Sequence, residues 1–238
     1  MGQQDAVSPN SASTERIQPT LHPFKGFLSP GIAFESGHTI WLFKFDETPI
    51  PPGAYSAVWI ESPAGDLTMY TDPATAGEYT KAYHDPDLIV GASIEWLSAD
   101  LTHIDVVLEA DDGSALALSA RLAQSSKTRL MELLAGSVPR VVQQSRIGAM
   151  ASSFMLTQLL GANGLQLRGT TETGIRYWGE ADHLRTIGDA SATLDGADLG
   201  QQIPGTSTHD FGDVKTARDP YVVFGVLNLE YPAPGQPL

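Results

Sequence analysis

Residues 101–123, LTHIDVVLEADDGSALALSARLA, decide the fold class of this chain. In their first part, Ile104, Val106 and Leu108 alternate with residues that are mostly polar, which is the pattern of a half-buried strand. The Asp-Asp-Gly at 111–113 is a tight-turn sequence, and a second alternating run follows it. The stretch therefore predicts an antiparallel hairpin within a mainly β protein.

Strand-like segments of the same kind occur on both sides of this hairpin. They are residues 38–45, 54–61, 67–71 and 88–97 before it, and 164–172, 175–187 and 221–231 after it. Turn sequences rich in Pro, Gly and Asp separate them, so we expect the first half of the chain to be a β-meander. Residues 77–85 are less strand-like, and we expect an edge strand or a loop there.

One long stretch, residues 125–163, has helical character instead. Its second part carries Met150 and Phe154 at helical spacing, and Arg146 and Arg168 enclose a run without any charged residue. That run contains too many polar side chains for a transmembrane helix. We expect a two-helix insert at 125–161, packed on a β-barrel as a plug or as a lid over an apolar cavity. An interfacial membrane helix is the alternative.

The composition restricts the environment and the partners. The formal net charge is −14, with 14 basic against 28 acidic residues, so we expect no binding to nucleic acid. Few of the basic residues are Lys and Asp outnumbers Glu, as in cytoplasmic proteins of salt-adapted (halophilic) prokaryotes. The chain has no Cys, which excludes disulfides, iron–sulfur clusters and thiolate chemistry.

The chain is expected to form one domain. Residues 1–20 are polar and lack the apolar segment of a secretory signal, so we expect a disordered tail and a cytoplasmic protein. Residues 21–238 are long enough to bury one core, and we expect a single β-barrel-like domain that carries the insert.

The strand at 175–187 carries the most interesting candidate site. Counting by twos, one face has Arg176, Trp178, Glu180 and Asp182, and the other has Tyr177, Gly179, Ala181 and His183. The first face could line a polar pocket mouth, with Trp178 stacking on a ligand. An outward, solvated face with a cross-strand ion pair fits the same pattern. The candidate ligand-binding residues are Arg176, Trp178, Met150 and Phe154, and the weak catalytic candidates are Glu180, Asp182 and His183.

Other motifs give little support for metal or cofactor chemistry. No two His residues stand at metal-ligand spacing, and His84 with Asp85 and Asp87 reads better as a turn than as a cation site. There is no nucleophile-elbow motif and no glycine-rich loop between a strand and a helix. We expect the aromatic side chains of the predicted strands at 38–45 and 54–61 to pack in a hydrophobic core rather than to line a cofactor-binding pocket; they are Trp41, Phe43, Tyr55 and Trp59. We therefore expect neither a metal nor a cofactor.

The order and spacing of the predicted strands and turns resemble those of a known group of proteins. AVWIESPAGDLTMYTDP and VGASIEWLSADLTHIDVVLEADDGSALALSARL, followed by GLQLRGTTETGIRYWGEADHL, resemble a family of acidic prokaryotic proteins. More distantly the pattern is similar to the lipocalin-like superfamily that includes carotenoid hydratases. The resemblance covers roughly residues 54–230 and implies an antiparallel, calycin-type barrel or curved sheet able to hold an apolar molecule. The His-rich and Trp-rich signatures of the hydratases are not present, so it assigns no catalytic residues.

Three functions fit these observations. The first is binding of a small hydrophobic molecule, such as a lipid, isoprenoid or pigment, in a β-barrel cavity. The second is an acid–base hydratase, isomerase or cyclase that acts on such a ligand. The third is a partner-binding protein that docks through the helical insert, which is basic because Lys127, Arg129, Arg140 and Arg146 stand against Glu132 alone. None of the three requires a membrane-inserted segment, and the sequence leaves open whether the protein is an enzyme.

Overall fold

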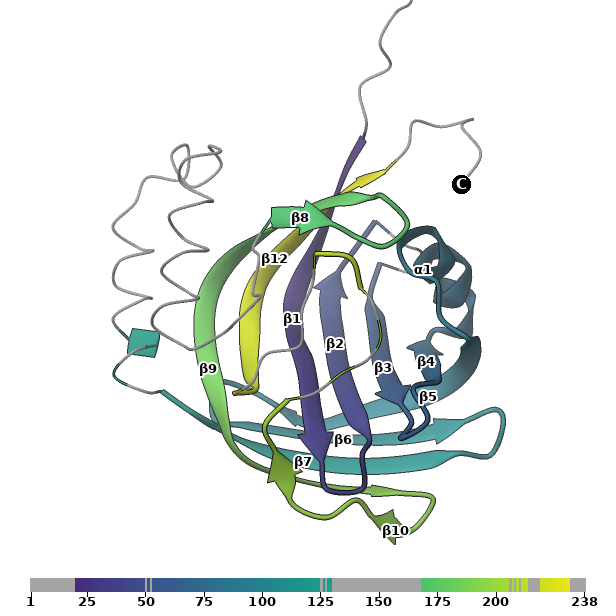
Figure 1. Ribbon diagram of the computed structural model, residues 1–238. Helices are drawn as coiled ribbons and strands as arrows, with labels where there is room; N and C mark the ends of the chain where they lie inside the picture. The colour runs from purple at the N-terminus through teal and green to yellow at the C-terminus, as the bar shows by residue number, and fades with distance from the viewer. Residues whose placement is uncertain are drawn as a thin grey trace, which may run out of the picture.

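The three-dimensional structure is a computed structural model (Figure 1). It describes residues 20–49, 51, 53–124, 126, 128, 129, 168–205, 207, 209, 211–213 and 219–231. The expected tail at 1–20 lies outside these residues apart from its last residue, Thr20. The expected insert at 125–161, with Met150 and Phe154, also lies outside them, except for residues 126, 128 and 129, which are helical.

The described residues are mainly β, as predicted. The strands are β1 (Thr20–Phe34), β2 (Thr39–Glu47), β3 (Tyr55–Glu61), β4 (Leu67–Asp72), β5 (Leu88–Ala99), β6 (His103–Ala110), β7 (Ala115–Ala123), β8 (Arg168–Thr170), β9 (Arg176–Leu194), β10 (Ala197–Asp198), β11 (Gln202–Ile203) and β12 (Tyr221–Tyr231). Two short helical elements, η1 (Ala74–Ala76) and α1 (Gly77–Tyr83), connect β4 to β5. The hairpin predicted at 101–123 is confirmed as β6 and β7.

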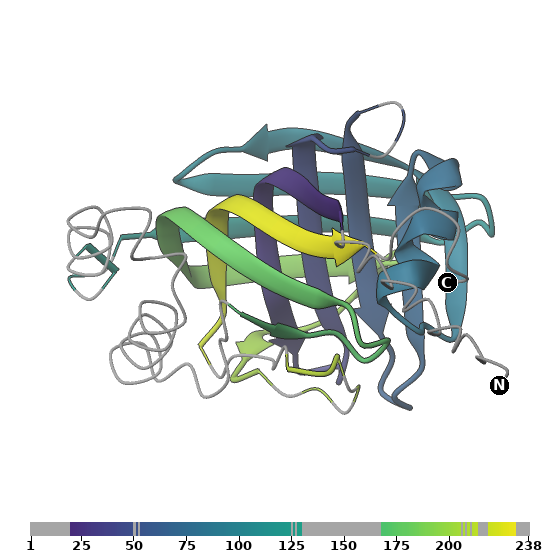
Figure 2. The ribbon, with the colours of Figure 1, turned by 90° about the horizontal axis from the view of Figure 1, so that it is seen from above.

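All the strands belong to one sheet, and nine of them form a closed ring. The order around the ring is β9-β12-β1-β2-β3-β4-β5-β6-β7, and β7 pairs again with β9 along almost its whole length. The three remaining strands, β8, β10 and β11, extend β9 or β1 outside the ring. Seen from above, β1–β3 cross the direction of β5–β7 steeply (Figure 2). Closure leaves the ring strands without a free edge, which removes a common route to aggregation.

The odd number of strands in the ring explains the helical connection between β4 and β5. A closed ring in which all neighbours are antiparallel needs an even number of strands, so nine strands require a parallel pair. That pair is β4 and β5, and all other ring pairs are antiparallel. A parallel pair needs a crossover connection, which η1 and α1 provide. The expectation of an edge strand or loop at 77–85 within a simple meander was therefore wrong.

One hydrophobic core fills the interior of the ring. Every ring strand contributes buried side chains to it, among them Ile32, Leu42, Val58, Tyr70, Ile94, Val106, Leu118, Ile187 and Val222. Ile104, Val106 and Leu108, which the alternation predicted to share a buried face, are all 1 % exposed or less.

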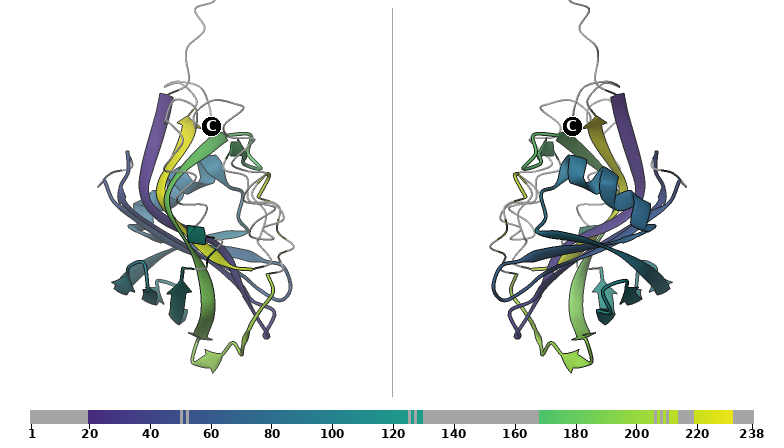
Figure 3. Two further views of the ribbon diagram at one scale, coloured as in Figure 1. Left: turned by 90° about the vertical axis from the view of Figure 1, so that its left-hand side faces the viewer. Right: turned by 90° about the vertical axis from the view of Figure 1, so that its right-hand side faces the viewer.

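A second hydrophobic core lies on the outer face of β1–β4 and of parts of β9 and β12. Adjacent residues of β2 show the division, because Leu42 belongs to the interior core and Trp41 to the outer one. The outer core is covered by Tyr83 of α1, by Phe211 and by Tyr177 of β9. In both side views α1 lies above and the ends of β6 and β7 lie below (Figure 3). Strands β1–β4 are therefore buried on both faces, which positions the candidate site.

Candidate functional site

An apolar cavity of about 140 Å³ lies within the outer core, partly open to solvent. Its wall is dominated by aromatic side chains, namely Phe24, Trp41, Phe43, Phe45, Tyr55, Trp59, Tyr83, Tyr177 and Phe211. Leu227 and Leu229 of β12 are among its aliphatic residues, and Thr80, His84, Thr171 and Glu180 supply polar groups. A concave, mostly apolar space with a few converging polar groups is the usual form of a small-molecule site.

Two glycines leave room in the wall of this cavity. Gly26 of β1 and Gly225 of β12 lie directly opposite each other, and both line the cavity. A Cβ at Gly26 would come 2.0 Å from the carbonyl oxygen of Lys44, and a Cβ at Gly225 would come equally close to that of Glu180. Both positions therefore exclude any other residue, and the wall there consists of backbone.

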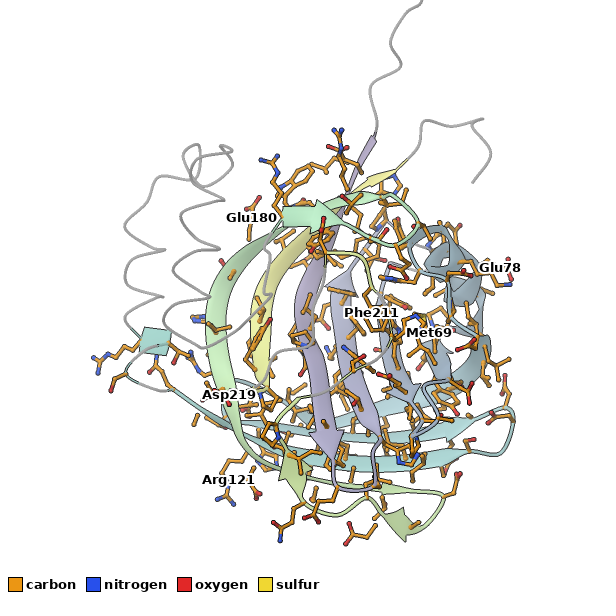
Figure 4. The ribbon with its side chains drawn as sticks, in the orientation of Figure 1. Met69, Glu78, Arg121, Glu180, Phe211 and Asp219 are labelled. Carbon is orange, nitrogen blue, oxygen red and sulfur yellow. The ribbon has the colours of Figure 1, made fainter. Side chains whose placement is uncertain are left out.

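Phe211 closes the cavity from the side opposite the sheet. Its ring centroid lies 5.1 Å from that of Trp41 and 5.5 Å from that of Trp59. In the view of Figure 4, Phe211 lies in front of β2 and β3, the strands that carry the two tryptophans. Phe211 is 2 % exposed, so the contact with the two tryptophans is a packed one.

The Tyr55 hydroxyl is held in a short hydrogen-bonded chain. The Thr80 hydroxyl donates to the carbonyl of Ala76 at 3.1 Å, so its only proton is used. The contact of 3.0 Å between the Tyr55 and Thr80 oxygens is therefore a donation from Tyr55. Burial raises the pKa of Tyr55 to about 12, which keeps the phenol neutral. Tyr55 thus shapes the wall without offering its proton to a ligand.

A histidine–glutamate pair lies at the polar part of the cavity. His84 Nδ1 is 2.9 Å from one carboxylate oxygen of Glu172 and 3.2 Å from the other. The two side chains are only 17 % and 13 % exposed. The backbone N–H of Asp85 also donates to Glu172, at 3.1 Å, which fixes the carboxylate from a second direction.

The turn between β8 and β9 brings this pair together across 88 positions of the chain. The Thr173 hydroxyl lies 3.0 Å and 2.9 Å from the carbonyl oxygens of Ala82 and Tyr83, which end helix α1. The Thr173 hydroxyl has one proton to share between these two carbonyls of the last helical turn, and this contact attaches the turn to the helix end. His84 is the residue at that helix end, and Glu172 stands next to Thr173 in the turn.

The His84 ring is also positioned by aromatic contacts. The His84 and Trp59 rings meet in an edge-to-face arrangement with a centroid distance of 4.5 Å, and the Phe211 ring centroid lies 6.0 Å from that of His84. Because Nδ1 is occupied by Glu172, Nε2 is the ring atom available to a ligand in the cavity. The pKa of Glu172 is pushed up by burial, but the hydrogen bond and the charge attraction of His84, with backbone N–H groups, outweigh this and lower it.

This lowered pKa predicts a pH-dependent stability difference. The ordinary value is 4.5, so the ionised Glu172 stabilises the fold above that pH and loses its contribution as the pH falls through the lower folded-state value. We expect Glu172→Gln to reduce Tm at neutral and mildly acidic pH, and the difference from wild type to vanish at strongly acidic pH. Thermal unfolding followed by circular dichroism measures it.

The matched control for this prediction is Glu78→Gln. Glu78 lies on α1, forms a surface pair with Lys81 and is 80 % exposed, so its replacement should leave Tm nearly unchanged (Figure 4). A Tm difference for Glu172→Gln that persisted unchanged at strongly acidic pH would contradict the prediction.

Arg176 and Trp178, the candidate ligand-binding residues of β9, lie on the opposite side of the strand from Tyr177. Arg176 is 76 % exposed and 3.8 Å from Glu230 on β12, a cross-strand ion pair. The Arg168 guanidinium lies over the Trp178 ring at 5.9 Å. Neither Arg176 nor Trp178 lines the cavity, whereas Tyr177 does.

A bulge in β9 separates the three catalytic candidates. His183 pairs with Phe224 and Ala181 with Gly225, so Asp182 has no opposite residue in β12. The expectation that Ala181 and His183 share one face was therefore wrong. Asp182 and His183 are exposed, and Glu180 alone of the three belongs to the cavity wall, where Asn228 donates to it at 3.5 Å.

The sequence analysis considered His84, the histidine of the cavity wall, only as part of a turn or a cation site, and its catalytic candidate was His183. His103 and Asp105, which alternation placed on one polar face, are in contact at 3.1 Å, but they lie on the outside of β6. Residues 84–87 form the irregular connection between α1 and β5, and the Asp87 carboxylate accepts the backbone N–H of Leu67 at 2.8 Å. No group of three or more His, Asp or Glu among the described residues is placed to hold a metal ion.

Comparison with models of known protein families and with curated proteins found no match. The function must therefore be argued from the site. Within the part of the chain that the structure describes, no helix has both the length and the apolar character needed to cross a membrane.

Proposed function

We propose that the protein binds a small apolar molecule with one or two rings in the aromatic cavity on the outer face of the strand ring. The observation that carries this proposal is a cavity of about 140 Å³ whose wall is formed almost entirely by aromatic and aliphatic side chains. A dry apolar cavity of about 150 Å³ in another protein takes up benzene. This comparison favours a compact ring compound over an extended lipid or isoprenoid.

The geometry of the wall supports a planar ligand. Trp59 and Phe211 are nearly parallel, with 27° between their ring planes, and Phe43 is tilted by 37° against Trp59. Offset-stacked and edge-on contacts with such rings stabilise an aromatic guest beyond its buried area. His84 and Thr171 at one part of the wall can orient a single polar group of that guest.

The binding site proposed here differs in place from the interior of a lipocalin-like barrel. The closed ring supports a calycin-type classification, and the parallel β4–β5 pair is a departure from an up-and-down barrel. Side chains from all ring strands pack the interior, so we assign the ligand to the outer face.

Indole, a bicyclic and mostly apolar probe, tests this function. We expect saturable binding to the wild-type protein by isothermal titration calorimetry. Leu227 is half-buried in the cavity wall, so Leu227→Trp should fill the space and weaken binding at least about tenfold, which corresponds to roughly 1.4 kcal/mol.

The control for this measurement is Leu97→Trp. Leu97 is 63 % exposed and is not part of the cavity wall, so the same substitution there should leave the affinity for indole unchanged. Absence of saturable binding in the wild type would refute the proposal, and so would equal affinity for Leu227→Trp and wild type.

A further inference from the structure

We propose that His84 acts as a general base on a molecule bound in the cavity, with Glu172 as the residue that positions it. This inference rests on the proposed function, because it requires a ligand in the same cavity. It adds an activity, namely proton abstraction from a small ring compound that carries an activated C–H bond.

The contacts of His84 select one form of its ring. Glu172 accepts the proton on Nδ1 through contacts of 2.9 Å and 3.2 Å, and the Asp85 N–H holds the carboxylate in place. An imidazole that donates from Nδ1 to a carboxylate carries its free electron pair on Nε2. A carboxylate in this position also stabilises the imidazolium that forms when Nε2 accepts a proton.

The surroundings of His84 favour proton transfer. Trp59 and Phe211 pack against the ring, and the side chain is only 17 % exposed. In such a poorly solvated site the attraction between an imidazolium and the Glu172 carboxylate is stronger than in water. The other titratable groups in the wall are Glu180, Tyr55, Tyr83 and Tyr177. Burial raises the pKa of Tyr55 to about 12, which keeps this phenol neutral. Burial likewise raises the pKa of Tyr177.

The reaction needs no cofactor and no oxidant. His84 Nε2 takes the proton from a carbon of the ligand, and the electron pair of the broken C–H bond enters a new π bond within the ligand. An oxygen of the ligand receives the negative charge, either as an enolate or as a leaving phenolate. The imidazolium then returns the proton to the ligand or to water. Isomerisations and eliminations of small carbonyl or heterocyclic ring compounds belong to this class.

The probe 5-nitrobenzisoxazole tests the base directly. Removal of its ring C–H proton forms a nitrile, breaks the N–O bond and releases a coloured phenolate, so atoms and charge balance without any co-reactant. We expect saturable turnover by the wild-type protein. His84→Gln should lower kcat at least about 100-fold, in line with the usual contribution of a general base.

Two further variants separate positioning from catalysis and from surface chemistry. Glu172→Gln should lower kcat about tenfold and leave KM nearly unchanged, because it alters the ring's tautomer and not the cavity. His103→Gln should leave turnover unchanged, because this histidine lies on the outside of β6 and is 36 % exposed.

A measurement on the wild-type protein keeps the proposal testable even if a variant fails to fold. Nitrogen-15 NMR of the histidine side chains should show one neutral imidazole, assigned to His84, with the proton on Nδ1 and none on Nε2. Finding the proton on Nε2 instead would overturn the proposal.

The outcomes of the kinetic experiment distinguish this inference from the binding function. If 5-nitrobenzisoxazole competes with indole but is not turned over, or if His84→Gln is fully active, the general base is refuted and the binding site stands. If neither compound binds, the proposed function fails and this inference fails with it.

Discussion

Leu42→Ala is expected to lower the free energy of unfolding by about 3 kcal/mol and to leave the affinity for indole unchanged. Leu42 is completely buried in the interior of the ring, where truncation leaves a cavity that the surrounding strands cannot fill. The next residue, Phe43, points to the opposite face of β2 and lines the proposed binding site. The substitution therefore affects the core without altering the wall of the site.

Urea denaturation and calorimetric titration of the same protein measure the two quantities. Phe43→Ala is the matched variant, one position along the same strand. It is only partly buried, so we expect a smaller loss of stability together with a clear loss of indole affinity. If folded Leu42→Ala no longer bound indole, the separation of interior and site across β2 would be wrong.

Phe211→Ala is expected to destabilise the protein by about 3 kcal/mol and to abolish indole binding. The Phe211 ring is packed on Trp41 and Trp59 and is 2 % exposed. Its removal takes away the aromatic surface that covers the cavity and opens the site to water. Stability and binding should therefore be lost together, in contrast to Leu42→Ala.

The control for Phe211→Ala is Tyr79→Ala. Tyr79 is an aromatic residue on α1 that is 38 % exposed and does not line the cavity, so its loss should have a much smaller effect on stability and none on binding. Phe211→Ala with wild-type affinity for indole would show that the cover contributes nothing to recognition.

Periodicity predicted the half-buried strands, because a strand with one buried face must alternate, but β1 (Thr20–Phe34) was not predicted. The hairpin at 101–123, its turn and the buried set Ile104, Val106 and Leu108 follow from local pattern alone. Strands buried on both faces, such as β2, have no alternation, and only their aromatic content identified them. Their double burial depends on what covers the outer face, which is a property of the whole fold.

The helix α1 could not be predicted for a related reason. Residues 77–83 connect two parallel strands, and the need for a parallel pair follows from the number of strands in the ring. The sequence of residues 77–83 contains no information on how many strands the ring has. The bulge at Asp182 is a similar case, since its register is fixed by the pairing with β12.

The His84–Glu172 pair was missed because 88 positions separate its members. His84 occurs in a turn-like sequence and Glu172 in a Thr-Glu-Thr-Gly turn, and each is ordinary by itself. The spacing of residues along the sequence reveals metal ligands or catalytic pairs that lie on the same helix, strand or loop. It cannot reveal a pair created by the docking of a turn onto the end of a distant helix, here through Thr173.

The pairing of the first and last ring strands has a consequence for biosynthesis. β1 lies between β2 and β12, and Thr20 is opposite Tyr231, so the earliest strand needs the latest one as its neighbour. While the chain emerges from the ribosome, the β1–β7 segment can pair locally, but one side of β1 remains uncovered until β12 has been made. Ring closure is thus a late event between distant parts of the chain, and such contacts slow folding. A nascent chain that stops short of Tyr221 would expose β1 as a free edge open to pairing with other chains.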